Sequence, residues 1–359
     1  MEGMVLNRSF WFGKRVFITG HTGFKGGWLS LMLSEMGAHV YGYALPPYSG
    51  PSFYTAAGVA NRLANSVIAD IRDADMLNNA MLTAKPDVVL HLAAQPLVRY
   101  SYSNPVETYA VNVMGTVNLF EAVRQTSSVK AVLNVTTDKC YDNVERNEPY
   151  SENEALGGYD PYSSSKACSE LATSAYRRSF LEAQGVALAS ARAGNVIGGG
   201  DWSADRLVPD FLRAIDRDEI LIIRYPNAIR PWQHVLEPLS GYLKLAEKLY
   251  VEGGDFADAW NFGPRDDDAR PVDWLLDRLC ALVPGARWCV DASPDLHEAG
   301  TLKLDSGKAI RKLHWRPRWV LEQALSQTVD WHLAWRKGAN MQVFSLEQIA
   351  KYENSVGDA

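Results

Sequence analysis

Two short segments of the chain carry hydroxyl, carboxyl and amino groups at spacings that suit acid–base chemistry. Thr137, Asp138 and Lys139 follow an apolar stretch, and Tyr162 and Lys166 lie four positions apart further along. On a helix this spacing puts Lys166 on the same face as Tyr162, where its ammonium favours the phenolate of a group whose free pKa is ~10. The pattern predicts that Tyr162 is a base near neutral pH while the Thr137 hydroxyl hydrogen-bonds a substrate oxygen, which suits hydride removal from a sugar carbinol.

A glycine-rich turn near the start of the chain strengthens this prediction, because a Tyr–Lys spacing alone occurs by chance on solvated helices. Residues 14–19 form a short apolar pattern, and the turn at 20–26 leads into a helical run. Glycines permit positive φ and a close approach to a pyrophosphate, whose charge the free amides and the helix dipole stabilise. The spacing is G-x-x-G-x-x-G, not the standard G-x-G-x-x-G. The predicted cofactor contacts of this turn are Gly20, Thr22, Gly23, Phe24 and Gly26.

Strand and helix patterns alternate through the first half, which predicts an α/β fold with a Rossmann-like, doubly wound parallel sheet. Strands are expected at residues 14–19, 38–44, 66–69, 86–92, 129–136 and 186–191, and helices include 105–126 and 161–184. The later part is mainly helical, with short strands near 220–224 and 287–290. We therefore place an NAD-binding domain at 1–195, to which a segment near 234–265 can return, and a smaller substrate-binding lobe at 196–359.

Ligands of doubly wound sheets bind at the carboxyl ends of the strands. The residues that follow the third and fourth predicted strands are Asp70, Ile71, Leu92, Ala93, Ala94 and Gln95. Small side chains at 93 and 94 let a cofactor pass close. The end of the second strand, residues 42–47, has no Arg or Lys for a 2′-phosphate, which favours NAD over NADP, although it also lacks an Asp or Glu for the ribose.

Composition excludes several classes of protein. The 359 residues carry a net charge of −6 without a dense Lys/Arg tract, which argues against nucleic acid or an anionic membrane as partner. The cysteines, Cys140, Cys168, Cys280 and Cys289, form no C-x-x-C pair and no zinc-like spacing, so we expect reduced thiols, no metal and a cytoplasmic location. No signal-peptide pattern and no long apolar span is present.

Together, the glycine turn, Asp70-Ile71, residues 91–94, Asn112, Thr137 and the Tyr162/Lys166 pair resemble the extended short-chain dehydrogenase/reductase superfamily. Thr137-Asp138 resembles the nucleotide-sugar 4,6-dehydratases within it. Asp138-Lys139, with the turn at 20–26 and residues 230–235, is similar to the members that act on CDP-glucose. The resemblance implies tightly bound NAD, held also by Asn112, Tyr162 and Lys166. It implies substrate contacts at Gln95, Thr137, Asn195, Arg206 and Arg230.

The implied activity is that of a lyase. Tyr162 removes the proton of the sugar 4-hydroxyl while hydride passes from C4 to NAD, and Asp138 protonates the departing C6 oxygen after the C5 proton is lost. Hydride then returns to C6, giving CDP-4-dehydro-6-deoxy-D-glucose for the dideoxy sugars of bacterial O-antigen, a part of lipopolysaccharide. The resemblance also implies a homodimer or homotetramer, with helices 105–126 and 161–184 in the dimer bundle.

Three residues depart from the superfamily pattern. Lys139 stands where most 4,6-dehydratases have the Glu that removes the C5 proton, so it is either that base or an electrostatic partner of Asp138 or a phosphate. His21 and Lys25 replace small or apolar residues of the glycine turn. They either alter cofactor binding or point to solvent. Surface ion pairs are the alternative for Arg206 and Arg230.

Three functions remain open. A dehydratase, for CDP-glucose or another nucleotide sugar, needs Asp138 beside Tyr162 and Lys166. A 4-epimerase keeps Thr137 and the Tyr–Lys pair without needing an acid at position 138. A non-catalytic NAD-sensing protein is expected to lose the pair, so its presence argues against a sensor.

Overall fold

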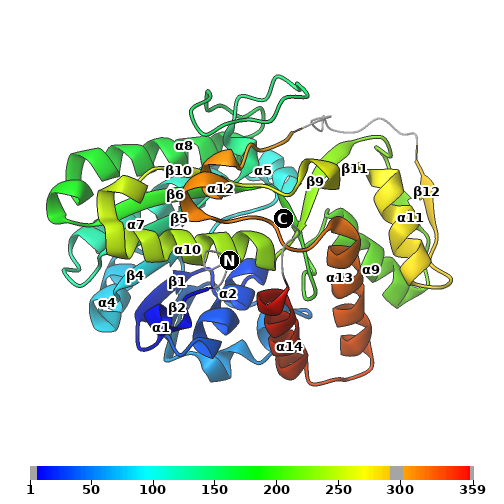
Figure 1. The fold of residues 1–359 in the computed structure, drawn as a ribbon, viewed down its shortest axis with the longest axis horizontal. Coiled ribbons are helices and arrows are strands. Elements are labelled where there is room, and N and C mark those ends of the chain that lie inside the picture. The colour runs from blue at the N-terminus through cyan, green and yellow to red at the C-terminus, as the bar shows by residue number, and fades with distance from the viewer. Residues whose placement is uncertain (1–5, 292–301, 356–359) are drawn as a thin grey trace.

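The computed structural model describes residues 6–291 and 302–355, and its largest unit is a parallel sheet with helices on both faces (Figure 1). The sheet has seven strands in the order β10-β6-β5-β4-β1-β2-β3, and every neighbouring pair is parallel. The strand order reverses direction between β1 and β4, as in doubly wound sheets. The predicted α/β, Rossmann-like fold class is therefore confirmed. The strands are β1 (Arg15–Thr19), β2 (His39–Ala44), β3 (Asn65–Ile68), β4 (Val88–His91), β5 (Ala131–Val135), β6 (Ala187–Ala193) and β10 (Ala259–Phe262).

Side chains of the sheet divide between two apolar cores. In β1, Val16 and Ile18 join the core that includes α2 (Phe24–Glu35) and α10 (Leu236–Glu252), whereas Phe17 joins the core of α4 (Ala74–Ala84) and α7 (Gly115–Arg124). Strands β4, β5 and β6 are buried along their whole length. Such strands are mostly apolar in sequence, which made them easy to locate. All six predicted strands lie within a few residues of observed ones.

Both long predicted helices are present, and each is interrupted by a π-helical turn. Residues 105–126 contain α6 (Pro105–Tyr109), the π turn Ala110–Met114 and α7. Residues 161–184 contain α8 (Pro161–Tyr176) and the π turn Arg177–Leu181. Helix α8 begins with a proline, and the Asp160 carboxylate accepts a hydrogen bond of 3.0 Å from the Ser163 amide. This start puts Tyr162 in the first turn of α8.

A third apolar core lies beneath α9 (Leu207–Arg217), α11 (Val272–Leu282) and α13 (Leu321–Arg336). Two small sheets border it, one of three strands in the order β11-β9-β7 and one of two, β12-β8. Strands β8 and β12 match the predictions near 220–224 and 287–290, but the three-stranded sheet lies outside the predictions. The strands are β7 (Asn195–Ile197), β8 (Leu221–Ile223), β9 (Ile229–His234), β11 (Ala269–Pro271) and β12 (Trp288–Val290).

The later part of the chain also contributes to the large sheet. Helix α10 packs on it, and β10 pairs with β6 at its edge. The limits of the two predicted domains stay a prediction. The C-terminal helix α14 (Met341–Asn354) buries Met341, Ile349 and Tyr352 in the same core as α2. The remaining helices are α1 (Arg8–Trp11), α3 (Phe53–Ala56), α5 (Val98–Ser103) and α12 (Gly307–Leu313).

Within the described residues, no helix has the length and apolar character needed to cross a membrane. All four cysteines are free thiols.

Candidate active site

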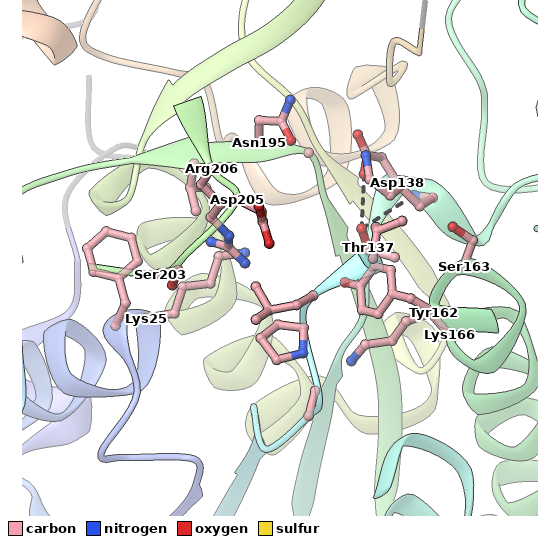
Figure 2. Close-up of a pocket in the computed structure, with 18 of the residues that line it drawn as sticks. Lys25, Thr137, Asp138, Tyr162, Ser163, Lys166, Asn195, Ser203, Asp205 and Arg206 are labelled. Carbon is pink, nitrogen blue, oxygen red and sulfur yellow. Dashed lines mark hydrogen bonds between the residues drawn. The ribbon is translucent and has the colours of Figure 1, made fainter. Parts of the chain in front are cut away.

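A cavity of about 810 Å³ lies at the carboxyl ends of the sheet strands, and residues from the second part of the chain close its other side (Figure 2). It brings together most of the residues that the sequence predicted. Those in its wall are Gly20, Thr22, Gly23, Phe24, Gly26, Asp70, Ile71, Leu92, Ala93, Ala94, Thr137, Asp138, Lys139, Tyr162, Lys166, Asn195, Arg206 and Arg230.

The glycine turn forms one wall, and its geometry suits a pyrophosphate. Gly20 has a φ of +79°, and a Cβ there would lie 2.7 Å from the Ala93 amide nitrogen. A Cβ on Gly26 would overlap the Gly20 carbonyl. Gly23 caps α2 without a side-chain hydrogen bond, so the first amides of this helix are available to an anion. The turn therefore fits the diphosphate of NAD.

Hydrogen bonds fix the adjacent wall at the end of β4. The Thr19 hydroxyl accepts bonds of 3.2 Å from the amides of Leu92 and Ala93, so its own proton goes to Nδ1 of His91 at 2.6 Å. The His91 ring is therefore protonated on Nε2, which donates to the Thr116 hydroxyl at 3.1 Å. Burial lowers the pKa of His91 to about 3, so the ring is neutral.

Two predicted site residues do not line the cavity. The Asn112 carboxamide accepts from the Gln95 amide at 2.8 Å and donates to the Ser165 hydroxyl at 2.9 Å. The Gln95 side chain turns away from the cavity and donates to the Thr108 hydroxyl at 2.9 Å. Both residues therefore connect the loop after β4 to the helices behind it. Asp70 does line the cavity, and it forms an ion pair of 2.6 Å with Arg72.

The predicted acid–base residues meet at the end of β5. Figure 2 shows Thr137 and Asp138 facing Tyr162 and Lys166 of α8. The Thr137 hydroxyl donates to the Asp138 carboxylate at 3.0 Å, and both side chains are buried. Thr137 also caps the short turn that carries Asp138 and Lys139. A buried carboxyl, bonded to Thr137, thus shares the cavity with the Tyr–Lys pair.

The surroundings of Tyr162 act in opposite directions on its phenolate. Burial raises its pKa to about 12, and the contact with Thr137 and the charge of Arg206 oppose this only in part. Burial also lowers the pKa of Lys166 to about 8, against the charge of Glu170. Lys166 donates to the Val135 carbonyl at 3.3 Å. With this pKa, Tyr162 is a phenol at neutral pH, and its role as a base stays a prediction.

Lys139 lines the cavity next to Asp138 and is half-buried. Among the described residues no ion pair joins its amino group to Asp138, so the structure does not show that alternative. Its backbone amide contacts the Thr137 hydroxyl at 3.4 Å.

The two unusual residues of the glycine turn have different environments. His21 is fully buried, its Nε2 lies 2.7 Å from the Ser66 hydroxyl, and a Cβ on Gly42 would overlap its ring. Lys25 instead enters the cavity beside Arg206 (Figure 2). Burial, followed by the charge of Arg206, lowers the pKa of Lys25 to about 7. Neither side chain points simply to solvent.

Arg206 is held by a buried carboxylate that the sequence prediction missed. Asp201 lies 3.4 Å from Arg206 and accepts from the Ser203 amide and hydroxyl at 3.0 and 2.6 Å. The only sequence indication was an Asp directly after three glycines. Asn195 begins β7 and pairs with β9, which carries Arg230. Together these arginines place positive charge across the cavity from Tyr162, where a diphosphate is favoured.

Comparison with known proteins agrees with this geometry. Residues 16–259 match the model of the NAD dependent epimerase/dehydratase family. The chain belongs to this family. It is 54% identical over 354 residues to the CDP-glucose 4,6-dehydratase of Salmonella typhimurium, covering 97% of this chain and 98% of that protein. The resemblance to the nucleotide-sugar 4,6-dehydratases is thereby confirmed.

Solved structures share the fold. UDP-glucose-4-epimerase of Stenotrophomonas maltophila, with bound NAD, has a TM-score of 0.78 at 20% identity, covering 91% of this chain and 100% of that chain. The NAD complex of dTDP-glucose 4,6-dehydratase of Bacillus anthracis has a TM-score of 0.73 at 19% identity, covering 91% and 99%.

Proposed function

We propose that the protein catalyses the NAD-dependent dehydration of CDP-glucose to CDP-4-dehydro-6-deoxyglucose. The observation that carries this proposal is the buried Asp138 carboxyl, hydrogen-bonded to Thr137 in the same cavity as Tyr162 and Lys166. Oxidation at C4 needs Tyr162 and Lys166. Elimination of a hydroxyl needs, in addition, an acid that protonates the departing oxygen. The similarity to the Salmonella typhimurium enzyme supports CDP-glucose as the substrate.

The first half of the reaction uses Tyr162 and its neighbours. Bound NAD supplies a hydride acceptor for C4 and later a hydride donor for C6. Tyr162 takes the proton of the 4-hydroxyl, and the Thr137 hydroxyl turns from Asp138 to donate a hydrogen bond to the same oxygen. Because burial raises the pKa of Tyr162 to about 12, nearby positive charge must stabilise its phenolate during this step. Lys166 and Arg206 provide that charge.

The second half uses Asp138 and Lys139. Oxidation at C4 makes the C5 proton acidic, and Lys139 is the side chain next to Asp138 that we assign to its removal. Asp138, as the carboxylic acid, gives a proton to the departing C6 oxygen, and water leaves. C6 would then take the hydride back, and the proton held by Lys139 would return to C5. Lys25, Arg206 and Arg230 hold the diphosphate, which keeps the sugar facing Tyr162.

The test is incubation of the NAD-loaded protein with CDP-glucose, with product identified by NMR and by the alkaline absorbance of 4-keto-6-deoxy sugars. Asp138→Asn cannot donate the second proton but leaves the residues of the first half in place. We expect this variant to accumulate reduced cofactor or the 4-keto-glucose nucleotide. Conversion at the wild-type rate would show that Asp138 is not the acid, and no conversion by the wild type would reject the proposed substrate.

We also propose a second copy of the chain as partner. Val106 of α6 and Leu171 of α8 are 82% and 60% exposed, and Tyr109 of α6 and Met114 of the following π turn are also exposed. Apolar groups on adjacent helices support a dimer through α6 and α8. Sedimentation of the wild type and of Leu171→Glu tests this, because the charge would release monomers.

The proposed dehydratase activity also implies a role and a location. We propose that the protein produces a precursor for the dideoxy sugars of O-antigen, in the cytoplasm.

A further inference from the structure

Helix α8 carries three buried groups at intervals of four residues, Tyr162, Lys166 and Glu170. This spacing puts all three on one face of the helix. The face meets the end of β5 and the two residues after it. Lys166 donates to the Val135 carbonyl at 3.3 Å, the Thr136 hydroxyl donates to Glu170, and Thr137 lies beside Tyr162. Each residue of the segment 135–137 therefore lies against one of these three side chains of α8.

The third group is fixed more firmly than the other two. The Glu170 carboxylate accepts from the Ser190 hydroxyl at 2.6 Å and from the Arg192 guanidinium at 2.8 Å, and both ionic side chains are almost fully buried. Arg192 is held in turn by the Tyr141 hydroxyl at 2.8 Å. A buried ion pair is costly to desolvate and adds little to stability on average, so its presence calls for another role.

We propose that Glu170 is a positioning residue of this active site, whose carboxylate holds Thr136, and with it residues 135–137, against α8 so that Thr137 and Lys166 stay beside Tyr162. This inference rests on the proposed dehydratase function, since the residues it positions are those of the first half-reaction. Glu170 itself touches neither the cavity wall nor the reacting atoms.

The charge of Glu170 has a second effect on Lys166. Glu170 raises the pKa of Lys166 against the larger effect of burial, so it favours the ammonium that supports the Tyr162 phenolate. Other charged or titratable groups act on this pair from neighbouring elements. They are Lys25 of α2, His91 of β4, Cys140 after β5, Arg177 after α8 and Arg192 of β6. Of these groups Cys140, like Glu170, raises the pKa of Lys166 and so favours its ammonium.

Two substitutions separate position from charge. Thr136→Val removes the hydroxyl that donates to Glu170 but keeps every charge. We expect kcat with CDP-glucose to fall ~10- to 100-fold, because residues 135–137 are displaced from α8. KM and the pH profile should be nearly unchanged, because no charge is altered. Glu170→Gln removes the charge as well. Here we expect a similar fall in kcat and a shift of the alkaline limb of the pH profile by about one to two units to lower pH.

Glu121→Gln is the matched control, since Glu121 also accepts from an arginine and a tyrosine hydroxyl but lies on α7 away from the cavity. It should leave kcat and the pH profile unchanged. Thermal melting and NAD affinity are measured on each variant without substrate. If Glu170→Gln does not fold, Thr136→Val decides the question. Wild-type kcat in Thr136→Val, or in a folded Glu170→Gln, overturns the positioning role, whereas an inactive wild type rejects the dehydratase proposal instead.

Discussion

At the scale of single residues, Lys25, Lys166 and Arg206 are among the cations that share the cavity with Tyr162. Lys166 and Arg206 face Tyr162 from α8 and from the loop before α9, and Lys25 enters from the glycine turn. Close like charges disfavour one another, which is why the charge of Arg206 lowers the pKa of Lys25. An anionic diphosphate relieves this repulsion. The cations of the cavity therefore favour an anion, and together they disfavour the ammonium form of Lys25.

The lowered pKa of Lys25 predicts that substrate binding is accompanied by proton uptake. With a pKa of about 7, Lys25 is mostly neutral at about pH 8, and a nearby diphosphate raises that pKa. CDP-glucose should therefore bind with uptake of protons, and its affinity should fall as pH rises above 7. Calorimetry of the inactive Tyr162→Phe protein in buffers of different ionisation enthalpy measures the uptake. It should shrink in Tyr162→Phe/Lys25→Met, and equal uptake in both proteins would assign it to Lys166, whose pKa is about 8.

A second prediction concerns Lys139 and the removal of the C5 proton. If it removes the C5 proton, the wild type in deuterated water places deuterium at C5, and Lys139→Met should lose this exchange. Product formation should fall ~10²–10⁴-fold while C4 oxidation continues, because Tyr162 is untouched. Exchange at the wild-type rate in Lys139→Met would remove the base role and leave an electrostatic one.

At the scale of elements, the close packing of the glycine turn predicts that a single added methyl group weakens NAD binding. In Gly26→Ala the new methyl group meets the Gly20 carbonyl, which is backbone and cannot move aside without opening the turn. NAD affinity should fall about tenfold or more, since the amides no longer surround the pyrophosphate. Gly254→Ala is the control, because its Cβ has no atom within 4 Å. Titration of both variants with NAD, followed by tryptophan fluorescence, makes the comparison. Equal affinities would show that the turn does not bind the diphosphate.

Prediction from sequence worked best for elements that local patterns define. Buried parallel strands are short apolar runs, so β1 to β6 could be located, and the residues that follow them necessarily reach one edge of the sheet. Thr137, Tyr162 and Lys166 meet there for that reason. The sheet of β7, β9 and β11 was missed because it pairs distant short segments, such as Asn195 with Trp232.

Side-chain direction was the other limit. Lys25 enters the cavity because of the rotational phase of α2, and its neighbour Arg206 comes from a segment far along the chain, which no local spacing specifies. Asn112 sits in a π-helical turn, where the regular helical spacing fails, and its carboxamide holds Gln95 instead of lining the cavity. The Glu170–Arg192 pair joins α8 to β6 across the sheet. Such contacts depend on tertiary packing rather than on sequence pattern.

At the scale of the whole molecule, one buried carboxylate ties the end of the chain to the sheet. Glu237 begins α10 and accepts from the amides of Arg318 and Trp319 at 3.0 and 2.8 Å and from the Tyr352 hydroxyl at 2.7 Å. Tyr352 lies in α14, near the C-terminal limit of the described chain. Three segments distant in sequence therefore converge on this side chain, which has no exposed surface.

This arrangement predicts how stability depends on pH. Burial raises the pKa of Glu237 from 4.5 to about 7, so between these values the folded protein holds a proton that the unfolded chain releases. Its contribution to the free energy of unfolding is present below 4.5 and is lost as pH rises through about 7, with a slope of up to ~1.4 kcal/mol per pH unit. Glu237→Gln cannot titrate, so urea unfolding at a series of pH values should show this slope removed. Glu247→Gln, at the surface of the same helix, is the control and should keep the slope. A wild-type slope in Glu237→Gln would mean that another buried group sets the pH dependence.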